Sequence, residues 1–376
     1  MTNYRVFDGH CDTPIELWLQ NQPLLENTLA VSLARAQRLG GWAQFFAFCT
    51  AWVEAKLPRP EIFARALDYF DAQLRENADK ITLCRTASEA EAAMQSGKCA
   101  AFLAIEGAEA VREDEGLLEH AYESGVRMIS LVWNLPNGLA APCGSDEGLT
   151  ETGRRFFKRA QALGMLVDVS HLSEKGFWDM IELAEKPVLA SHSNSFSVCP
   201  HPRNLTDDQF RAIRDLGGVV GLNLFLHFVG EPTMDALVAH VEHFLNLGGE
   251  KTLCLGGDMD GCEALAAGLS GMQDMPKLYD ALKARGYGAK RRTTFHLFRF
   301  DGRDARTLGL ILAVAGICIT ARAFGHGYME FYPAMTPVLL GNSSYTMFVF
   351  YAVLMFLPGI LETKEAIRWR SYGLNT

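Results

Sequence analysis

The sequence lacks the features that mark several classes of protein. Its nine cysteines form no C-x-x-C pair and show no regular spacing, so we expect buried, reduced thiols rather than a disulfide framework. The first residues, MTNYRVFDGH, contain no basic segment followed by an apolar one. This start does not resemble a signal peptide, and we expect a cytoplasmic protein body. No internal repeat or low-complexity segment stands out.

The chain also lacks a basic surface that would suit a nucleic acid. The net charge of -9 hides an asymmetry, because residues 1–290 carry 26 Lys+Arg against 39 Asp+Glu, whereas residues 291–376 carry 9 against 5. An acidic body without a basic patch interleaved with aromatic residues argues against nucleic acid as a partner. The basic tail surrounds apolar segments, which is more typical of a membrane surface.

Short apolar runs alternate with longer helical patterns over the first 260 residues. Strands that alternate with helices indicate βαβ units and a parallel sheet, and eight of them fit an α/β fold of the TIM-like (β/α)8 barrel type. An open, doubly wound sheet is the alternative. Amphipathic helices are predicted at 60–77, 150–163 and 206–216, the last with Thr206 as N-cap. The eight predicted strands are 5–10, 43–49, 100–105, 127–132, 164–169, 187–192, 218–224 and 252–258.

The tail, residues 289–376, has a different character. Residues 307–321 and 345–361 are uncharged apolar runs of 15 and 17 residues, each short of the roughly 20 residues of a membrane-spanning helix. Arginines precede the first run, and basic residues follow the second. A hairpin of two membrane helices with both ends on the inner face fits this charge pattern. Buried core helices of a soluble domain are the alternative.

Residues able to bind metal stand at the ends of the predicted strands. The first strand ends in "DGHCDTP", in which His10 and Asp12 are two residues apart and project to the same face. The third ends in "FLAIEG", which places Glu106 after an apolar run. A carboxylate in such a place must be paired, protonated or bound to metal, because an isolated buried charge is costly.

Three further predicted strands also end in histidine or aspartate residues that could bind metal. "VDVSH" supplies His171, "VLASHS" supplies His192, and "LGGDMDG" supplies Asp258 and Asp260. In a barrel these ends meet at one rim, where the active sites of this fold are built. His10, Asp12, Glu106, His171 and His192 are enough ligands for two metal ions that share a carboxylate, and such a pair can activate water at neutral pH.

The other histidines are weaker candidates. His120, His240 and His243 fall in helical patterns, and we expect them on solvated faces. His227 follows the seventh strand, and the sequence does not decide its role.

The motifs "DGHCDTP", "AIEG", "DVSHLS", "ASHSNSFSVCPHPRNLTDDQ" and "GGDMDG" occur in this order. Residues 4–288 thereby resemble the membrane (renal) dipeptidase family of binuclear zinc peptidases. The resemblance implies a metallodipeptidase (EC 3.4.13-like) in the barrel of residues 1–288. One zinc would be held by His10, Asp12 and Glu106 and the other by Glu106, His171 and His192, with Glu106 and a hydroxide bridging them.

The resemblance also implies residues that bind the dipeptide. Arg203 matches the arginine that holds the substrate carboxylate. Asp258 matches the aspartate near the substrate amino group, which is also a candidate proton donor or acceptor. The family commonly has Thr-His-Asn at the end of the fourth strand, where this chain has Trp133 and Asn134. We interpret this difference as a change in rate or substrate choice that leaves hydrolysis intact.

The second departure from the family is the tail. The chain offers one helix, 275–284, after the eighth strand, so the helices that close the barrel are incomplete. From "ARGYG" onward the tail resembles the last part of the transmembrane component of an energy-coupling-factor transporter, which suggests a chimera. We expect membrane contact through residues 307–361, which would tether the body to the inner face, and a homodimer is the candidate assembly.

Two other functions remain open. A binuclear amidohydrolase could act on another small amide or lactone, although Arg203 and Asp258 favour a zwitterionic substrate. A membrane transporter subunit could instead carry the barrel as an inactive appendage.

Overall fold

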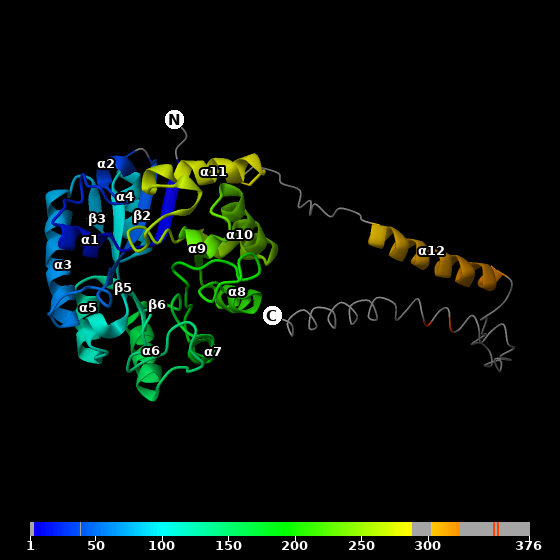
Figure 1. Cartoon of the computed structure of the whole chain (residues 1–376), viewed down its shortest axis with the longest axis horizontal. Coiled ribbons are helices and arrows are strands. Elements are labelled where there is room, and N and C mark those ends of the chain that lie inside the picture. Colours follow the sequence, from blue (N-terminus) through cyan, green and yellow to red (C-terminus); the bar gives the residue numbers. More distant parts are fainter. Residues whose placement is uncertain (1–3, 38, 288–301, 324–348, 350–351, 353–376) are drawn as a thin grey trace. The chain divides into compact units, whose positions relative to one another are not determined.

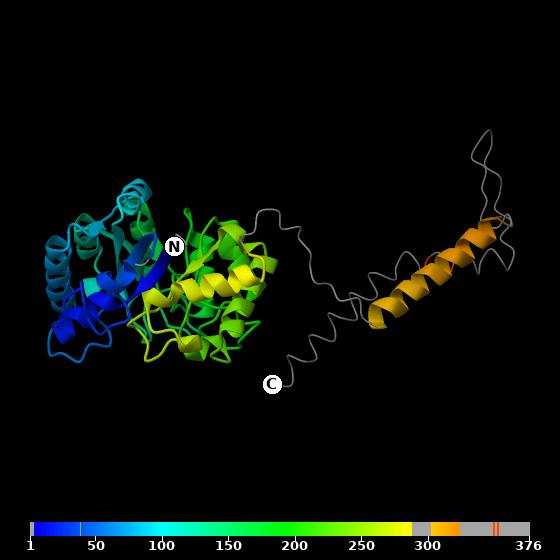
Figure 2. The same cartoon turned by 90° about the horizontal axis from the view of Figure 1, so that it is seen from above.

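The computed structural model describes residues 4–37, 39–287, 302–323, 349 and 352 (Figures 1 and 2). The chain divides into two units, Met1–Lys290 and Arg291–Thr376. The first unit contains a curled parallel sheet with helices around it, an α/β fold. The site described below lies wholly in this unit.

The sheet runs in the order β6-β5-β4-β2-β1-β8-β7, and β3 pairs with β4 outside this path. Its ends approach each other through residues 189 and 190, because Leu189 bridges to Asp168 of β6 and Ala190 bridges to Val220 of β7. Every one of these pairings is parallel. The strands are β1 Arg5–Cys11, β2 Gly41–Cys49, β3 Ile81–Leu83, β4 Cys99–Glu106, β5 Val126–Ser130, β6 Leu166–Asp168, β7 Val220–Leu222 and β8 Leu253–Leu255.

Seven of the eight predicted strands are confirmed, with shorter bounds at several ends. The predicted strand at 187–192 contributes single bridges instead of a regular ladder, but it occupies the expected place between its neighbours. The sequence did not predict β3. This strand of three residues pairs with Cys99 to Ala101 in the first half of β4. Further along β4, its place is taken by β5.

The helices of the first unit lie around the sheet, and the three amphipathic helices predicted at 60–77, 150–163 and 206–216 are observed as α3, α6 and α8, each beginning within one residue of its predicted start. Thr206 caps α8 in a capping box with Gln209, and Thr150 caps α6 through the backbone N–H of Gly153. Such caps satisfy N–H groups that have no partner within the helix. The helices are α1 Thr13–Gln20, α2 Leu33–Ala36, α3 Arg59–Glu76, α4 Ala87–Gln95, α5 Glu115–Glu123, α6 Glu151–Leu163, α7 Glu174–Leu183, α8 Asp207–Asp215, α9 Leu226–Val229, α10 Met234–Asn246, α11 Met275–Ala284 and α12 Gly302–Ala323.

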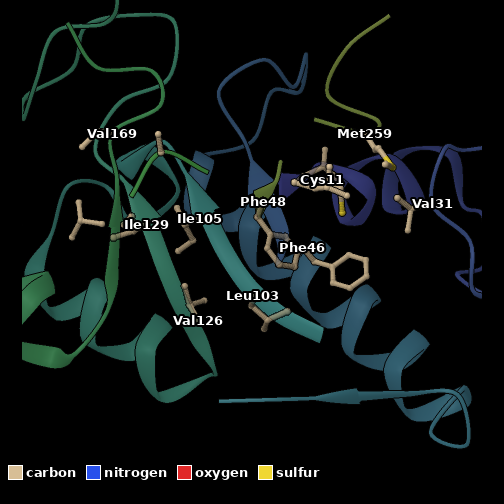
Figure 3. Packing of buried hydrophobic residues seen from close by; sticks show 14 of the residues in the cluster. Cys11, Val31, Phe46, Phe48, Leu103, Ile105, Val126, Ile129, Val169 and Met259 are labelled. Carbon is tan, nitrogen blue, oxygen red and sulfur yellow. The ribbon is translucent and has the colours of Figure 1, made fainter. Parts of the chain in front are cut away.

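The core has two layers, because alternate residues of a strand point to opposite faces. Phe46 and Phe48 of β2, with Leu103 and Ile105 of β4, belong to the large cluster between the strands and the helices (Figure 3). The residues between them belong to a second cluster that also contains Met128 and Leu189 from more distant parts of the ring, so this cluster fills the inside of the curled sheet. Its members from β2 and β4 are Ala43, Phe45, Ala47, Ala100, Phe102 and Ala104.

The helix α11 lies beside the first strand (Figures 1 and 2). Tyr279 donates a hydrogen bond to the carbonyl of Arg5 at 3.4 Å, and its ring packs on Tyr4 at 5.6 Å. A groove of about 300 Å³ remains between this helix and β1, β7 and β8, and Phe7 in its wall is 40% exposed. This apolar groove lies beside the first and last strands of the sheet.

The second unit contains α12, which includes the first predicted apolar run. None of the helices in the described part of the chain is both long enough and apolar enough to cross a membrane. The described residues therefore do not show the predicted two-helix hairpin. Nearly all of the second apolar run, 345–361, lies outside the described residues.

Candidate metal centre

The five predicted metal ligands converge at the carboxyl end of the sheet. Glu106 Oε1 lies 2.9 Å from His171 Nε2 and 3.6 Å from His192 Nε2. Its other oxygen, Oε2, lies 3.5 Å from His10 Nε2, which is also 3.3 Å from Asp12 Oδ2. Even the most exposed of the five, His171, is only 7% exposed. Glu106 thus directs one oxygen to each of two neighbouring groups of ligands.

Three glycines allow the segment with His192 to approach the neighbouring strands. A Cβ atom on Gly9 would lie 2.9 Å from the carbonyl oxygen of Ser191. The same distance would be 1.9 Å for a Cβ atom on Gly221 and 1.8 Å for one on Gly256. Because backbone atoms cannot move aside as a flexible side chain can, each of these positions needs a residue without Cβ. The close approach brings the rings of His10 and His192 together, with centroids 4.0 Å apart and planes tilted by 40°.

A buried carboxylate behind the histidines fixes their orientation. Ser191 Oγ donates to Asp168 Oδ2 and lies 2.7 Å from His192 Nδ1 and 3.4 Å from His10 Nδ1. Asp168 also accepts hydrogen bonds from Ser170. With Nδ1–H directed at Ser191, His192 keeps a free lone pair on Nε2, as a metal ligand requires. Asp168 and Ser191 were not identified from the sequence.

Asn134 makes a contact that the sequence did not predict. Its Oδ1 lies 2.8 Å from His171 Nδ1, so the amide oxygen accepts from Nδ1–H and leaves Nε2 of His171 free for metal. Trp133 lies beside the same histidine, with ring centroids 6.2 Å apart. Both residues were expected to bind substrate, and that role stays a prediction. The observed contact adds an orienting role for Asn134.

The charges of the site favour a cation. Burial opposes ionisation of Glu106, but His10 and His171 outweigh it and hold its pKa well below the usual value. Burial lowers the pKa of His192, and nearby His10 and Arg203 lower it further. Burial and the charge of Glu106 raise the pKa of Asp12 to about 7. Asp12 Oδ1 is buried without a hydrogen-bond partner in the described structure, so this oxygen is available to coordinate a metal ion.

The ligand atoms lie close enough together for metal binding. Glu106, His171 and His192 have their ligand atoms within 4.8 Å of one another, as do His10, Asp12 and Asp258. The set of imidazole and carboxylate groups suits zinc and other first-row divalent ions. The residues therefore fit a site for divalent metal ions.

Arg203 and Asp258 lie next to this cluster. Arg203 donates to the carbonyl of Ser170 and lies 3.0 Å from His171 Nε2, while its Nε is buried without a partner. It also lines a cavity of about 690 Å³. Asp258 accepts a hydrogen bond of 3.0 Å from Asn223 and holds a left-handed backbone conformation, φ 53°. Non-glycine residues rarely adopt it.

The structure corrects the expectation for His240 and assigns a role to Asp260. His240 is buried, not solvated, and accepts from the backbone N–H of Ser195 at 3.1 Å; burial lowers its pKa to about 4. It therefore supports the loop after His192 instead of binding solvent. His120 is exposed as expected. Asp260 accepts from Thr13 and from the backbone N–H of Ala30, which is a structural role.

A curled parallel sheet with buried imidazoles and carboxylates at its carboxyl end is typical of metal-dependent hydrolases. Residues 1–293 match the family described as Membrane dipeptidase (Peptidase family M19). The chain therefore belongs to the membrane dipeptidase family, which consists of metallopeptidases.

The chain is also similar to individual proteins and solved structures. An uncharacterised protein in the pqqA 5′ region of Klebsiella pneumoniae is 38% identical over 229 residues, which are 57% of this chain and 84% of that protein. A metallopeptidase from Rhodobacter sphaeroides, solved with a phosphinate mimic of the dipeptide L-Ala-D-Ala, is 29% identical with a TM-score of 0.69. Dipeptidase AC, a metallopeptidase of family M19, is also 29% identical with a TM-score of 0.70. Each structure aligns over 76% of this chain and 94% of its own.

Proposed function

We propose that the chain hydrolyses dipeptides at a binuclear zinc centre. The observation that carries the proposal is the placement of Glu106, whose two oxygens face two separate groups of ligands. His10 and Asp12 would hold one ion together with Glu106 Oε2. His171 and His192 would hold the other together with Glu106 Oε1. When bound, two zinc ions supply Lewis-acid polarisation of the scissile carbonyl and a hydroxide at neutral pH.

The chain's own residues would bind the two ends of a dipeptide. The guanidinium of Arg203 can donate two parallel hydrogen bonds to the C-terminal carboxylate, and its buried Nε lacks a partner in the described structure. Asp258 can accept from the ammonium group, and Asn223 fixes the orientation of its carboxylate. The dipeptide mimic bound by the Rhodobacter sphaeroides relative agrees with a substrate of this size and charge.

Asp258 would also move a proton. Its carboxylate lies in a group with His10 and Asp12, next to the site where the peptide bond would break. A carboxylate in this position can take a proton from the attacking water and deliver it to the leaving amine.

A charged substrate distinguishes dipeptide hydrolysis from action on a neutral amide or lactone. Purified protein should contain two zinc ions per chain and hydrolyse L-Ala-D-Ala. Acetylation of the substrate amino group and amidation of its carboxylate should each reduce kcat/KM, because each removes one partner of Asp258 or Arg203. Equal turnover of the free and doubly blocked dipeptides would favour the amidohydrolase alternative. A protein that binds no divalent metal would contradict both.

The roles of the tail remain predictions from the sequence. They comprise membrane contact through residues 307–361, the origin of residues 289–376 in a transporter component, and the homodimer. The complete set of metal ligands argues against an inactive barrel that serves only as an appendage of a transporter.

A further inference from the structure

Cys49 stands at the end of β2, directly beside Glu106. The two residues are partners in the parallel pairing of β2 with β4. Along β2, Ala43, Phe45 and Ala47 belong to the cluster inside the curled sheet. Cys49 continues this alternation, so its side chain points inward at the level of the metal ligands. It is buried, with 1% of its surface exposed.

The thiol lies within the metal cluster and not merely near it. The ligand atoms of Asp12, Cys49 and Glu106 all lie within 4.8 Å of one another. Zinc holds thiolate sulfur at about 2.3 Å and carboxylate oxygen at about 2.0–2.2 Å. Ligands of one ion therefore lie within about 4.5 Å of one another, close to the observed limit. The buried oxygen of Asp12 that lacks a hydrogen-bond partner is independent evidence that a cation belongs in this group.

The neighbouring cysteine differs in orientation. Cys11 lies between His10 and Asp12 in the sequence, but its side chain belongs to the outer core cluster and its Sγ donates to the carbonyl of Phe45 at 3.5 Å (Figure 3). Cys99 is buried at the opposite end of β4. Both thiols are thus buried, like that of Cys49. Neither belongs to a group of candidate metal ligands in the described part of the chain.

We propose that Cys49 supplies a thiolate ligand to the ion held by His10, Asp12 and Glu106. The inference rests on the proposed metal centre and specifies one of its two positions as a mixed nitrogen, oxygen and sulfur site. On metal binding the S–H bond breaks, a sulfur–metal bond forms, and the proton leaves to solvent. Thiolate ligands favour zinc and softer ions over magnesium and manganese, so this position discriminates between metals.

Cobalt replacement tests the inference without use of activity. The full chain, depleted of metal and loaded with Co²⁺, should bind two ions and show a sulfur-to-cobalt charge-transfer band in the near ultraviolet. Cys49→Ala and Cys49→Ser should both lose this band. Cys99→Ala, which removes a buried thiol from the other end of the sheet, should retain it. In competition with a chelator, Cys49→Ala should bind one of its two ions at least about tenfold more weakly.

The outcomes separate this inference from the proposed function. Two bound Co²⁺ ions without the band would overturn the role of Cys49 and leave the metal centre intact. A band that persists in both Cys49 variants would overturn it as well. A full chain that binds no Co²⁺ would overturn the metal centre itself. Cys49→Ser retains a small polar group, so it provides the test if Cys49→Ala fails to fold.

Discussion

His171 and His192 direct their Nε2 atoms at each other across 2.9 Å. Glu106 Oε1 lies beside both of them. Burial lowers the pKa of both histidines, and nearby Arg203 lowers them further, so two lone pairs and a carboxylate oxygen face one point. Like partial charges at this distance repel unless a cation lies among them. This arrangement suits two ligands of one metal ion, which is the role proposed for both histidines.

Replacement of His192 by alanine should remove one of the two metal ions and abolish hydrolysis. The loss should exceed the roughly 10–100-fold effect of removing an orienting partner, because a direct ligand is lost. Metal analysis and dipeptide hydrolysis would measure it. His120→Ala, on the exposed side of α5, is the control and should retain both. Turnover at the wild-type level in His192→Ala would refute the metal assignment.

Asp168 should act on the metal through Ser191. Asp168→Asn and Ser191→Ala should each weaken metal binding by about 10–100-fold, because His192 and His10 lose the hydrogen bonds that orient them. Since both changes break the same connection, the double variant should be little worse than either single variant. Titration with a competing chelator would measure the affinities. Fully additive losses would show that the two residues act separately.

The carboxyl of Asp12 makes the metal-free protein sensitive to pH. Its pKa is raised to about 7 from 3.8, chiefly by burial. Between these values the folded protein binds a proton that the unfolded chain has released, so the free energy of unfolding falls as pH rises and then levels off above about 7. Asp12→Asn removes this effect. Without metal, the variant should therefore gain in melting temperature over wild type from pH 4 to pH 7.

Thermal unfolding in the presence of a chelator would measure the difference in melting temperature between Asp12→Asn and wild type. Asp68→Asn, which removes a negative charge from the exposed side of α3, is the matched control. With metal present the order should reverse, because Asp12→Asn lacks a ligand. If the difference in melting temperature is constant from pH 4 to pH 8, the pKa of Asp12 is not raised in the folded protein.

The candidate ligands could be predicted from the sequence because each follows an apolar segment of the predicted barrel wall. An isolated polar residue in such a place is easily recognised, and the parallel arrangement of strands brings these ends to one edge. Asp168 is also an isolated polar residue, between two valines in "VDVSH". It was not identified because the sequence analysis assigned the metal-binding role in this motif to His171. Cys49 ends the second strand in the same way. It was missed because a buried cysteine normally belongs to an apolar core.

Other features depend on contacts between distant parts of the chain. The link from Asp168 through Ser191 to His10 joins three separate segments. The burial of His240 depends on packing of α10 against the loop at Ser195, and its helical pattern alone suggested a solvated face. Likewise β3 pairs over only three residues, too few for a recognisable alternation.

Gly256→Ala should unfold the region around His192. Its new Cβ atom would lie 1.8 Å from the carbonyl oxygen of Ser191 and 3.0 Å from the Cα of Gly221, and backbone atoms on both sides prevent relief by a side-chain movement. We expect a loss of at least about 3 kcal/mol in the free energy of unfolding, together with loss of metal from the position that His192 serves.

Gly41→Ala provides the matched control for this change. It adds the same methyl group to β2, where the nearest atom would be Arg5 Cγ at 3.5 Å, an ordinary contact. Its effect should be within about 1 kcal/mol. Denaturant unfolding and metal content would be measured for both variants. If both show the same stability and metal content, the close approach at Ser191 does not require glycine, and the placement of His192 must depend on other contacts.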